Sequence, residues 1–204
     1  SFRFALHDLL DPLPGQPTYS SIIMGNFNLT AEQTDFSRLN RVRLENGDLF
    51  RISSFQPITH WQRNTSWDGK VGVKTIRDGG CEECLVVTAE AGVGATVAPK
   101  LSESFISLLN KFHLDYGDGL RKPLRFAVGP EVWWRWVPSR KLSFLAIVGY
   151  KWSNYLEQPL FAQQIFTQSL ELRYHLKKDW SLYLKGDGQQ EHTRAGTLGF
   201  YNYF

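Results

Sequence analysis

The stretch Cys84–Ala98, CLVVTAEAGVGATVA, decides the fold class because apolar residues recur at every second position along it. The recurring set is Leu85, Val87, Ala89, Ala91, Val93, Ala95 and Val97, and the residues between them include Thr88, Glu90 and Thr96. A period of two places these sets on opposite faces of a β-strand. The stretch is therefore predicted to be a strand with one apolar face and one face of polar or small residues.

The same alternation recurs along the chain, and no amphipathic helix is predicted. The expected strands are residues 18–30, 36–46, 64–77, 84–98, 103–116, 122–136, 140–153, 162–177, 179–188 and 191–204. Strands of soluble proteins average about 5–6 residues, whereas a membrane-spanning strand needs about 9–11. We predict an all-β protein, an antiparallel up-and-down transmembrane β-barrel of about ten strands, within a range of roughly eight to twelve.

The connections between these strands alternate in length. APKLS, VPSR and KKD are short, whereas RDGGCEEC, YGDGLR, SNYLEQP and GDGQQEH are longer and more polar. Outer-membrane barrels have short periplasmic turns and longer external loops. The long connection SSFQPITHWQRN falls on the short-turn side, and we expect it to fold over the barrel mouth or to pack on a periplasmic neighbour.

Aromatic residues are predicted to form a girdle at both membrane interfaces, where Trp and Tyr are enriched. The predicted girdle is Trp133, Trp134, Trp136, Trp180, Tyr201 and Tyr203 near one rim, with Tyr150 and Trp152 near the other. The closing strand ends in TLGFYNYF, and its Phe200 and Phe204 resemble the C-terminal signal by which outer-membrane barrels are recognised for insertion. A soluble β-sandwich or a lipocalin-like barrel with an aromatic core is the alternative.

Composition sets wider limits. The chain has 204 residues, of which 42% are hydrophobic, and no apolar run reaches the about 18 residues of a transmembrane helix. The net charge of +3 is scattered, so no nucleic-acid surface is expected. The chain starts at Ser1 without Met or an apolar leader, and we expect it to be a mature segment whose signal peptide is missing.

The polar faces of the strands are predicted to line the barrel lumen. The predicted cluster is Glu90, Lys111, His113, Arg125, Glu171, Arg173 and His175. Side chains of mixed charge would fill a narrow barrel as ion pairs. A small selective channel or a catalytic constellation is the alternative, but no serine lies in a recognisable nucleophile motif. The chain is therefore predicted not to be an enzyme and to need no cofactor or metal.

Two cysteines, Cys81 and Cys84, stand in the sequence GGCEEC. One pair cannot form a four-cysteine zinc site, and the βαβ context of a thioredoxin-like site is missing. A local disulfide in an oxidising compartment is the favoured interpretation, and inert thiols or redox or metal chemistry are the alternatives.

The first seventeen residues, SFRFALHDLLDPLPGQP, do not alternate, and Pro12, Pro14 and Pro17 oppose a regular strand. We therefore divide the chain into a periplasmic junction or rim segment, residues 1–17, and a barrel, residues 18–204. Within the first part, His7, Asp8 and Asp11 are expected to form a capped turn or a plug-like segment.

This opening resembles the C-terminal region, a domain of unknown function, of Gram-negative envelope proteins with an upstream periplasmic domain of the Lnb type. The matching positions are Phe2-Arg3, His7 to Pro12, Ser54, Pro57 and Ser66-Trp67. The resemblance implies that His7, Asp8 and Asp11 lie at the junction of the two domains. It also implies that catalysis belongs to the upstream domain, and that neither Cys81 nor Cys84 is catalytic.

Taken together, the sequence predicts an integral outer-membrane barrel that attaches a larger periplasmic protein to the membrane. The expected partners are outer-membrane lipid or lipopolysaccharide, the outer-membrane assembly machinery, a covalent or associated periplasmic domain and a further copy of the chain. The alternatives are a stand-alone narrow channel or ring-forming lipid-associated protein, an outer-membrane enzyme with a lumenal site, and a soluble barrel that binds an apolar ligand.

Overall fold

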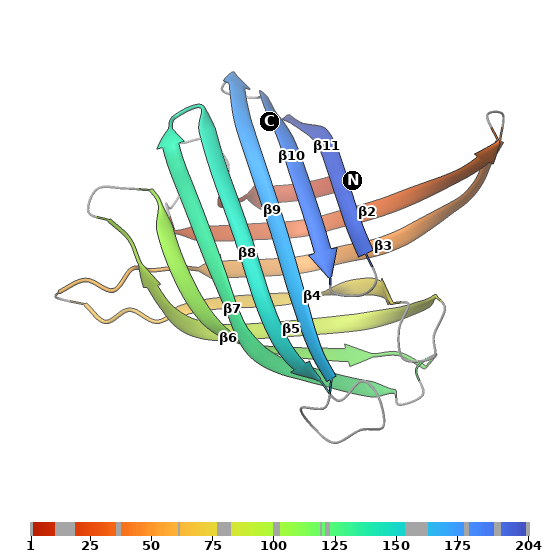
Figure 1. The fold of residues 1–204 in the computed structure, drawn as a ribbon, viewed down its shortest axis with the longest axis horizontal. Coiled ribbons are helices and arrows are strands. Elements are labelled where there is room, and N and C mark those ends of the chain that lie inside the picture. The colour runs from red at the N-terminus through yellow and green to blue at the C-terminus, as the bar shows by residue number, and fades with distance from the viewer. Residues whose placement is uncertain are drawn as a thin grey trace.

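The structure, a computed structural model, describes residues 2–10, 19–35, 38–60, 62–76, 83–99, 103–118, 120, 123–153, 163–177, 180–189 and 193–202. They form one antiparallel sheet of eleven strands in sequence order (Figure 1). The strands are β1 (Phe2–His7), β2 (Ser20–Asp35), β3 (Arg38–Ser54), β4 (Ser66–Ile76), β5 (Cys84–Val97), β6 (Phe105–Tyr116), β7 (Leu124–Ser139), β8 (Leu142–Ser153), β9 (Gln163–Lys177), β10 (Trp180–Gln189) and β11 (Thr193–Asn202). No helix within the described residues is long and apolar enough to cross a membrane.

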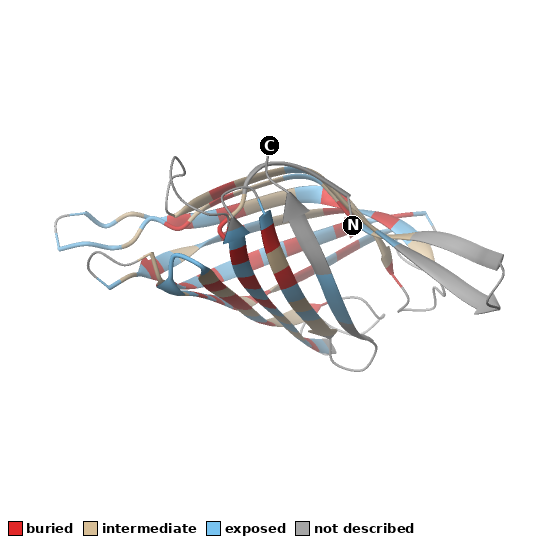
Figure 2. Cartoon of the chain, turned by 90° about the horizontal axis from the view of Figure 1, so that it is seen from above, coloured by how far each residue is buried: buried red, intermediate tan, exposed pale blue. Residues whose placement is uncertain are grey.

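The sheet is curled, so that one face lies inside the curl and the other lies outside it (Figures 1 and 2). Strands β3 and β7 are four places apart in the sheet, which corresponds to about 19 Å along a flat surface. The Arg51 guanidinium of β3 nevertheless lies 4.7 Å from the centre of the Trp133 ring of β7. Side chains of one face therefore meet across the interior, and the sheet has the all-β, barrel-like form that the sequence predicts.

Strand β6 shows how the chain distributes its side chains between the two faces. Buried and exposed residues alternate strictly from Phe105 to Tyr116. The buried set is Phe105, Ser107, Leu109, Lys111, His113 and Asp115, and the exposed set includes Ile106, Leu108, Phe112 and Leu114. The more polar face is thus the buried one, which is the reverse of a soluble amphipathic strand.

Most predicted strand ends lie within a few residues of those in the structure, but two strands differ from the prediction. Strand β3 does not end at residue 46 but continues through ENGD to Ser54, with a register shift against β4 between Asp48 and Phe50. Such a shift bends a strand without ending it. The segment Phe2–His7, predicted to be irregular, forms β1 and pairs with β2, because the prolines that oppose a strand all follow it.

Closure of the predicted barrel requires the first and last strands to pair, and this pairing lies outside the ladders that the structure describes. There the sheet begins at β1 and ends at β11, which pairs with β10. The backbone of Phe200 and Tyr201 belongs to β11, whereas Tyr203 and Phe204 lie outside the described residues. The insertion signal and barrel closure therefore stay predictions.

Replacing Gly94 by alanine is expected to destabilise the pairing of β5 and β6. An added Cβ would overlap the Leu108 carbonyl oxygen and lie 2.8 Å from the Leu109 Cα, and backbone cannot move aside cheaply. We expect the free energy of unfolding to fall by about 1–3 kcal/mol, measured by urea titration of tryptophan fluorescence. Gly186→Ala is the control because nothing lies within 4 Å of its added Cβ. Equal losses in the two variants would contradict the prediction.

Candidate functional site: the charged interior

The centre of the interior is the ammonium group of Lys111 on β6. Its Nζ lies 2.5 Å from Asp68 Oδ2, 3.2 Å from Glu131 Oε1 and 3.5 Å from Glu90 Oε2. These carboxylates come from β4, β7 and β5, so a single cation joins four strands. The Lys111 side chain is only 2% exposed, and a charge so buried needs such partners to be tolerated.

A second cation, Arg51 of β3, shares the central carboxylate. Arg51 Nε donates to Asp68 Oδ1 at 3.1 Å, and the Ser53 hydroxyl donates to the same oxygen at 2.5 Å. The Arg51 guanidinium also stacks on Trp133, whose indole Nε1 donates to Glu131 Oε1 at 2.7 Å. Asp68 is thus held by two cations and a hydroxyl, and the Trp133 ring bridges the two sides of the network.

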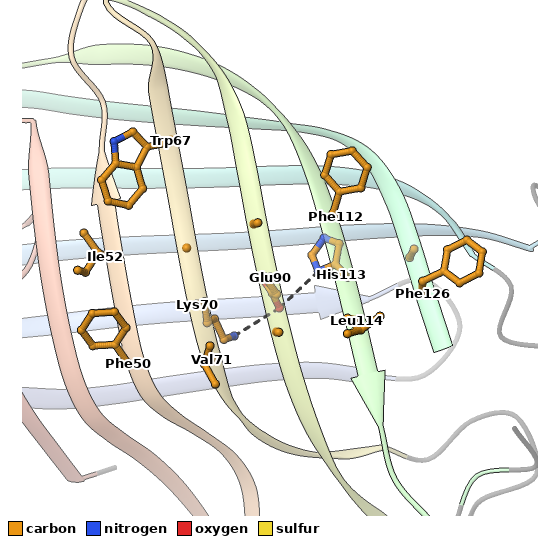
Figure 3. A pocket seen from close by; sticks show the side chains of 14 residues that line it. Phe50, Ile52, Trp67, Lys70, Val71, Glu90, Phe112, His113, Leu114 and Phe126 are labelled. Carbon is orange, nitrogen blue, oxygen red and sulfur yellow. Dashed lines mark ion pairs between the residues drawn. The ribbon is translucent and has the colours of Figure 1, made fainter. Parts of the chain in front are cut away.

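The network continues along β4 and β5 toward the end of the sheet that carries the longer loops. Lys70 Nζ lies 3.1 Å from Asp48 and 3.6 Å from Glu90, and Glu90 also contacts His113 (Figure 3). Lys74 Nζ lies 2.9 Å from Asp115 Oδ1. Arg125 faces Asp115 in the β6–β7 ladder and is itself buried. Opposite charges therefore follow one another along this part of the interior.

A separate polar group lies nearer the short-turn end, the end defined by connections 98–104, 140–141 and 178–179. Arg173 Nη2 donates to Glu171 Oε1 at 2.5 Å and to Asp8 Oδ2 at 3.0 Å. His175 Nδ1 lies 2.6 Å from the Ser181 hydroxyl, and its Nε2 lies 3.4 Å from the Ser143 hydroxyl. Ser181 is completely buried, and this serine–histidine contact joins β9 and β10.

Asp8 brings with it an N-terminal segment that enters the interior, and we call Asp8–Leu10 the plug segment. Leu9 and Leu10 pack in one buried apolar cluster whose other members are Phe55, Phe105, Leu109, Trp133 and Leu145. Phe55 stacks on Phe105 with ring centres 5.2 Å apart, and its amide N–H donates to the Tyr19 carbonyl at 2.6 Å. Partial burial raises the pKa of the nearby Tyr19 phenol, which stays protonated at neutral pH.

The long connection that did not fit the alternating loop pattern now has a definite course. Its Ser53 and Ser54 end β3, Phe55 packs in the apolar cluster, and Pro57 forms a bridge with Thr96 of β5. Ile58 and His60 beyond it are exposed. The connection therefore contributes the Phe55 side chain to the interior, and its later residues extend away from the sheet.

The seven residues of the predicted polar cluster all lie on the inner face, but in more than one group. Glu90, Lys111 and His113 belong to the central network, Arg125 lies beside Asp115, and Glu171, Arg173 and His175 belong to the short-turn group. The prediction did not include Asp68 and Glu131, although each occupies an alternate position of a predicted strand. It also missed Arg51, which lies beyond residue 46, where the predicted strand ended. Phe55 had no such signal, because it follows the end of a strand.

The predicted aromatic girdle is wrong at one residue. Trp133 is 2% exposed and belongs to the interior, because adjacent strand residues face opposite sides and Trp134 takes the outer one. Trp134, Trp136 and Trp180 are exposed on the outer face near the short-turn end, and Tyr150 and Trp152 pack edge to face near the other end. The side chain of Tyr201 and the whole of Tyr203 lie outside the described residues.

Three further predicted sites are described only in part. Cys84 begins β5 and packs against Ile76, Val86 and Leu120, but Cys81 lies outside the described residues, so their disulfide stays a prediction. Of the predicted junction residues, Asp8 is placed by its bond to Arg173. His7 is described only as backbone in β1, and Asp11 lies outside the described residues.

The curled antiparallel sheet with a filled, charged interior defines a barrel-like all-β domain. The chain belongs to the family described as a domain of unknown function, DUF7840, whose model matches residues 1–203. Comparisons with curated proteins and with solved structures found no match. The family match covers both the plug segment and all the strands, so the two form one family unit.

Lys111→Met is expected to lower the free energy of unfolding by about 3–5 kcal/mol, because it leaves buried carboxylates without their shared cation. Urea titration of the refolded protein followed by tryptophan fluorescence measures the loss. The control is Lys185→Met on β10, whose side chain is 34% exposed and pairs with Asp187 at 3.0 Å. That variant is expected to change stability by at most about 1 kcal/mol. A loss for Lys111→Met no larger than the control's would contradict a central role.

Leu10→Ala is expected to destabilise the protein by about 2–5 kcal/mol, because Leu10 is 1% exposed and its removal leaves a cavity against Phe55 and Leu109. The matched control is Leu10→Met, which conserves volume and should cost less than about 1.5 kcal/mol. The same urea titration compares them. If both variants retain the stability of the parent chain, the plug segment does not contribute to the packed interior.

Proposed function

We propose that this domain is an integral outer-membrane β-barrel that holds a larger periplasmic protein at the membrane and does not conduct solutes. The observation that carries the proposal is the inverted distribution of side chains. The outer face exposes large apolar residues on strand after strand, among them Leu85, Leu108, Phe112 and Leu172, while charged residues are buried. An outer wall of this kind is stable in hydrocarbon and would be a liability in water.

The filled interior supports the non-conducting part of the proposal. Across its central section, ion pairs link β3, β4, β5, β6 and β7, and beyond them the plug segment and Phe55 occupy the short-turn end. Interiors of narrow barrels are typically filled by their own side chains. Positive and negative charges alternate in this network, so it provides neither a wide aqueous path nor a field of one sign.

The role as a membrane attachment rests on the resemblance to envelope proteins with an upstream Lnb-type domain and on the plug segment. Residues of the resemblance motif, Asp8 to Leu10 and the neighbourhood of Ser54 and Pro57, meet at the short-turn end, which we assign to the periplasm. A domain on that side would be tied to the barrel through a buried segment rather than a loose linker. Any catalysis would then belong to the upstream domain.

A narrow channel is the second candidate, because the inner face of β10 is less filled beyond Tyr183. Lys185 and Asp187 form an ion pair whose side chains remain 34% and 43% exposed. Water could reach this pair, whereas the Lys111 side chain is only 2% exposed. The two candidates differ in one measurable property, the conductance of the inserted protein.

Two measurements on the purified full chain test the proposal. In detergent gels we expect the unheated protein to migrate faster than the heated one, as compact membrane barrels do. In planar bilayers we expect insertion without conductance steps. Unchanged migration together with failure to insert into the bilayer would overturn the membrane location. Regular conductance steps that Lys185→Met or Asp187→Asn alters would favour the channel.

A further inference from the structure

The outer face carries a hollow of about 460 Å³ that lies over strands β3 to β7 (Figure 3). Its two walls are large apolar side chains on opposite sides. Phe50 and Val71 stand on one side, and Phe112 and Leu114 stand on the other. The lining residues Lys70, Glu90 and His113 turn their side chains toward the interior, where they pair with one another, so the hollow itself is apolar.

The floor between these walls is made of small residues. Gly69 pairs with Ala91, and Val71 pairs with Ala89, so two short side chains lie next to a residue with none. A Cβ added at Gly69 would meet no atom within 4 Å. Glycine weakens a strand interior by about 0.5–1 kcal/mol, and it often marks the close approach of a ligand or another backbone. No neighbour within the described chain requires glycine at this position.

The chemistry of the hollow selects among possible occupants. A peptide or a lipid headgroup would leave polar groups without hydrogen-bond partners against this lining. A second copy of the chain would need a contact of about 800 Å² on each partner, which a single narrow slot between two walls does not supply. The walls on β4 and β6 are two strand spacings apart, about 10 Å between backbones, and a gap of this width suits one extended hydrocarbon chain.

We propose that this hollow binds one acyl chain of a membrane lipid, with the chain lying over Gly69 and Ala91. This inference rests on the proposed membrane location, which brings hydrocarbon to the outer wall on all sides. The inference goes beyond that location in one respect: an acyl chain stays longer in the hollow than elsewhere on the outer wall. In the hollow it contacts the floor and both walls, whereas elsewhere it contacts a convex surface.

The test uses the full chain inserted in phosphatidylethanolamine vesicles that contain a phospholipid with a photoactivatable diazirine in its acyl chain. After illumination, mass spectrometry of peptides maps the labelled segments. We expect labelling to concentrate in the segments 66–76, 84–97 and 105–116. Gly69→Leu should reduce labelling there about tenfold, because the new side chain displaces at least about two methylene groups.

Gly186→Leu on β10 is the matched control. Its added side chain also meets open space, and it lies on the exposed face but outside the hollow. It should leave the labelling of β4 to β6 unchanged. Uniform labelling around the wall, or equal effects of the two variants, would overturn the acyl-chain site while leaving the membrane barrel in place. Failure of the parent chain to enter the vesicles would instead overturn the proposed function.

Discussion

The rest of the structure depends on the contact of Lys111 with the carboxylates of Asp68, Glu131 and Glu90. Where a sheet buries charged residues instead of apolar ones, that part of its inner side gains little from the hydrophobic effect. The charged section of the interior must therefore be held by paired charges, since an isolated buried charge costs far more than any packing contact supplies. The Lys111 ammonium group meets this requirement at the centre of the sheet, because it pairs with carboxylates from three other strands.

The interior is built in sections that follow from this arrangement. The central network contains the charges, and the Trp133 ring forms its boundary, with Arg51 on its face and Phe55 4.9 Å away at the ring centres. Beyond that boundary the apolar cluster accepts Leu9 and Leu10, so the plug segment packs against hydrocarbon side chains instead of entering the charged section. Asp8 then reaches Arg173, which already carries Glu171, and ties the segment to the opposite part of the wall.

Much of this fold was predictable because a β-strand has a period of two. The period predicted the ends of β5 and β6 to within two residues. It also assigned Lys111, His113 and Arg173 to the same face of the sheet. It failed where tertiary contacts decide. Trp133 was assigned to the membrane interface because of its residue type, although only its neighbour Trp134 lies on the outer face. Phe55, in a connection, carries no periodic signal. Phe2, Phe4 and Leu6 of β1 do recur at every second position, but the prolines that follow led to the prediction of an irregular segment.

Positions on the inner face also tolerate fewer substitutions than positions on the outer face. The charges of the central network have partners at short distances, so Lys111 or Asp68 cannot be exchanged alone. Most outer positions need only be apolar in a lipid environment. Gly69 and Gly186 both depart from this pattern on the outer wall, since a larger apolar residue at either position would satisfy hydrocarbon and stabilise the strand. The hollow distinguishes the two, because Gly69 lies on its floor and Gly186 lies outside it. A side chain at Gly69 would fill space that the proposed acyl chain occupies, whereas one at Gly186 would not.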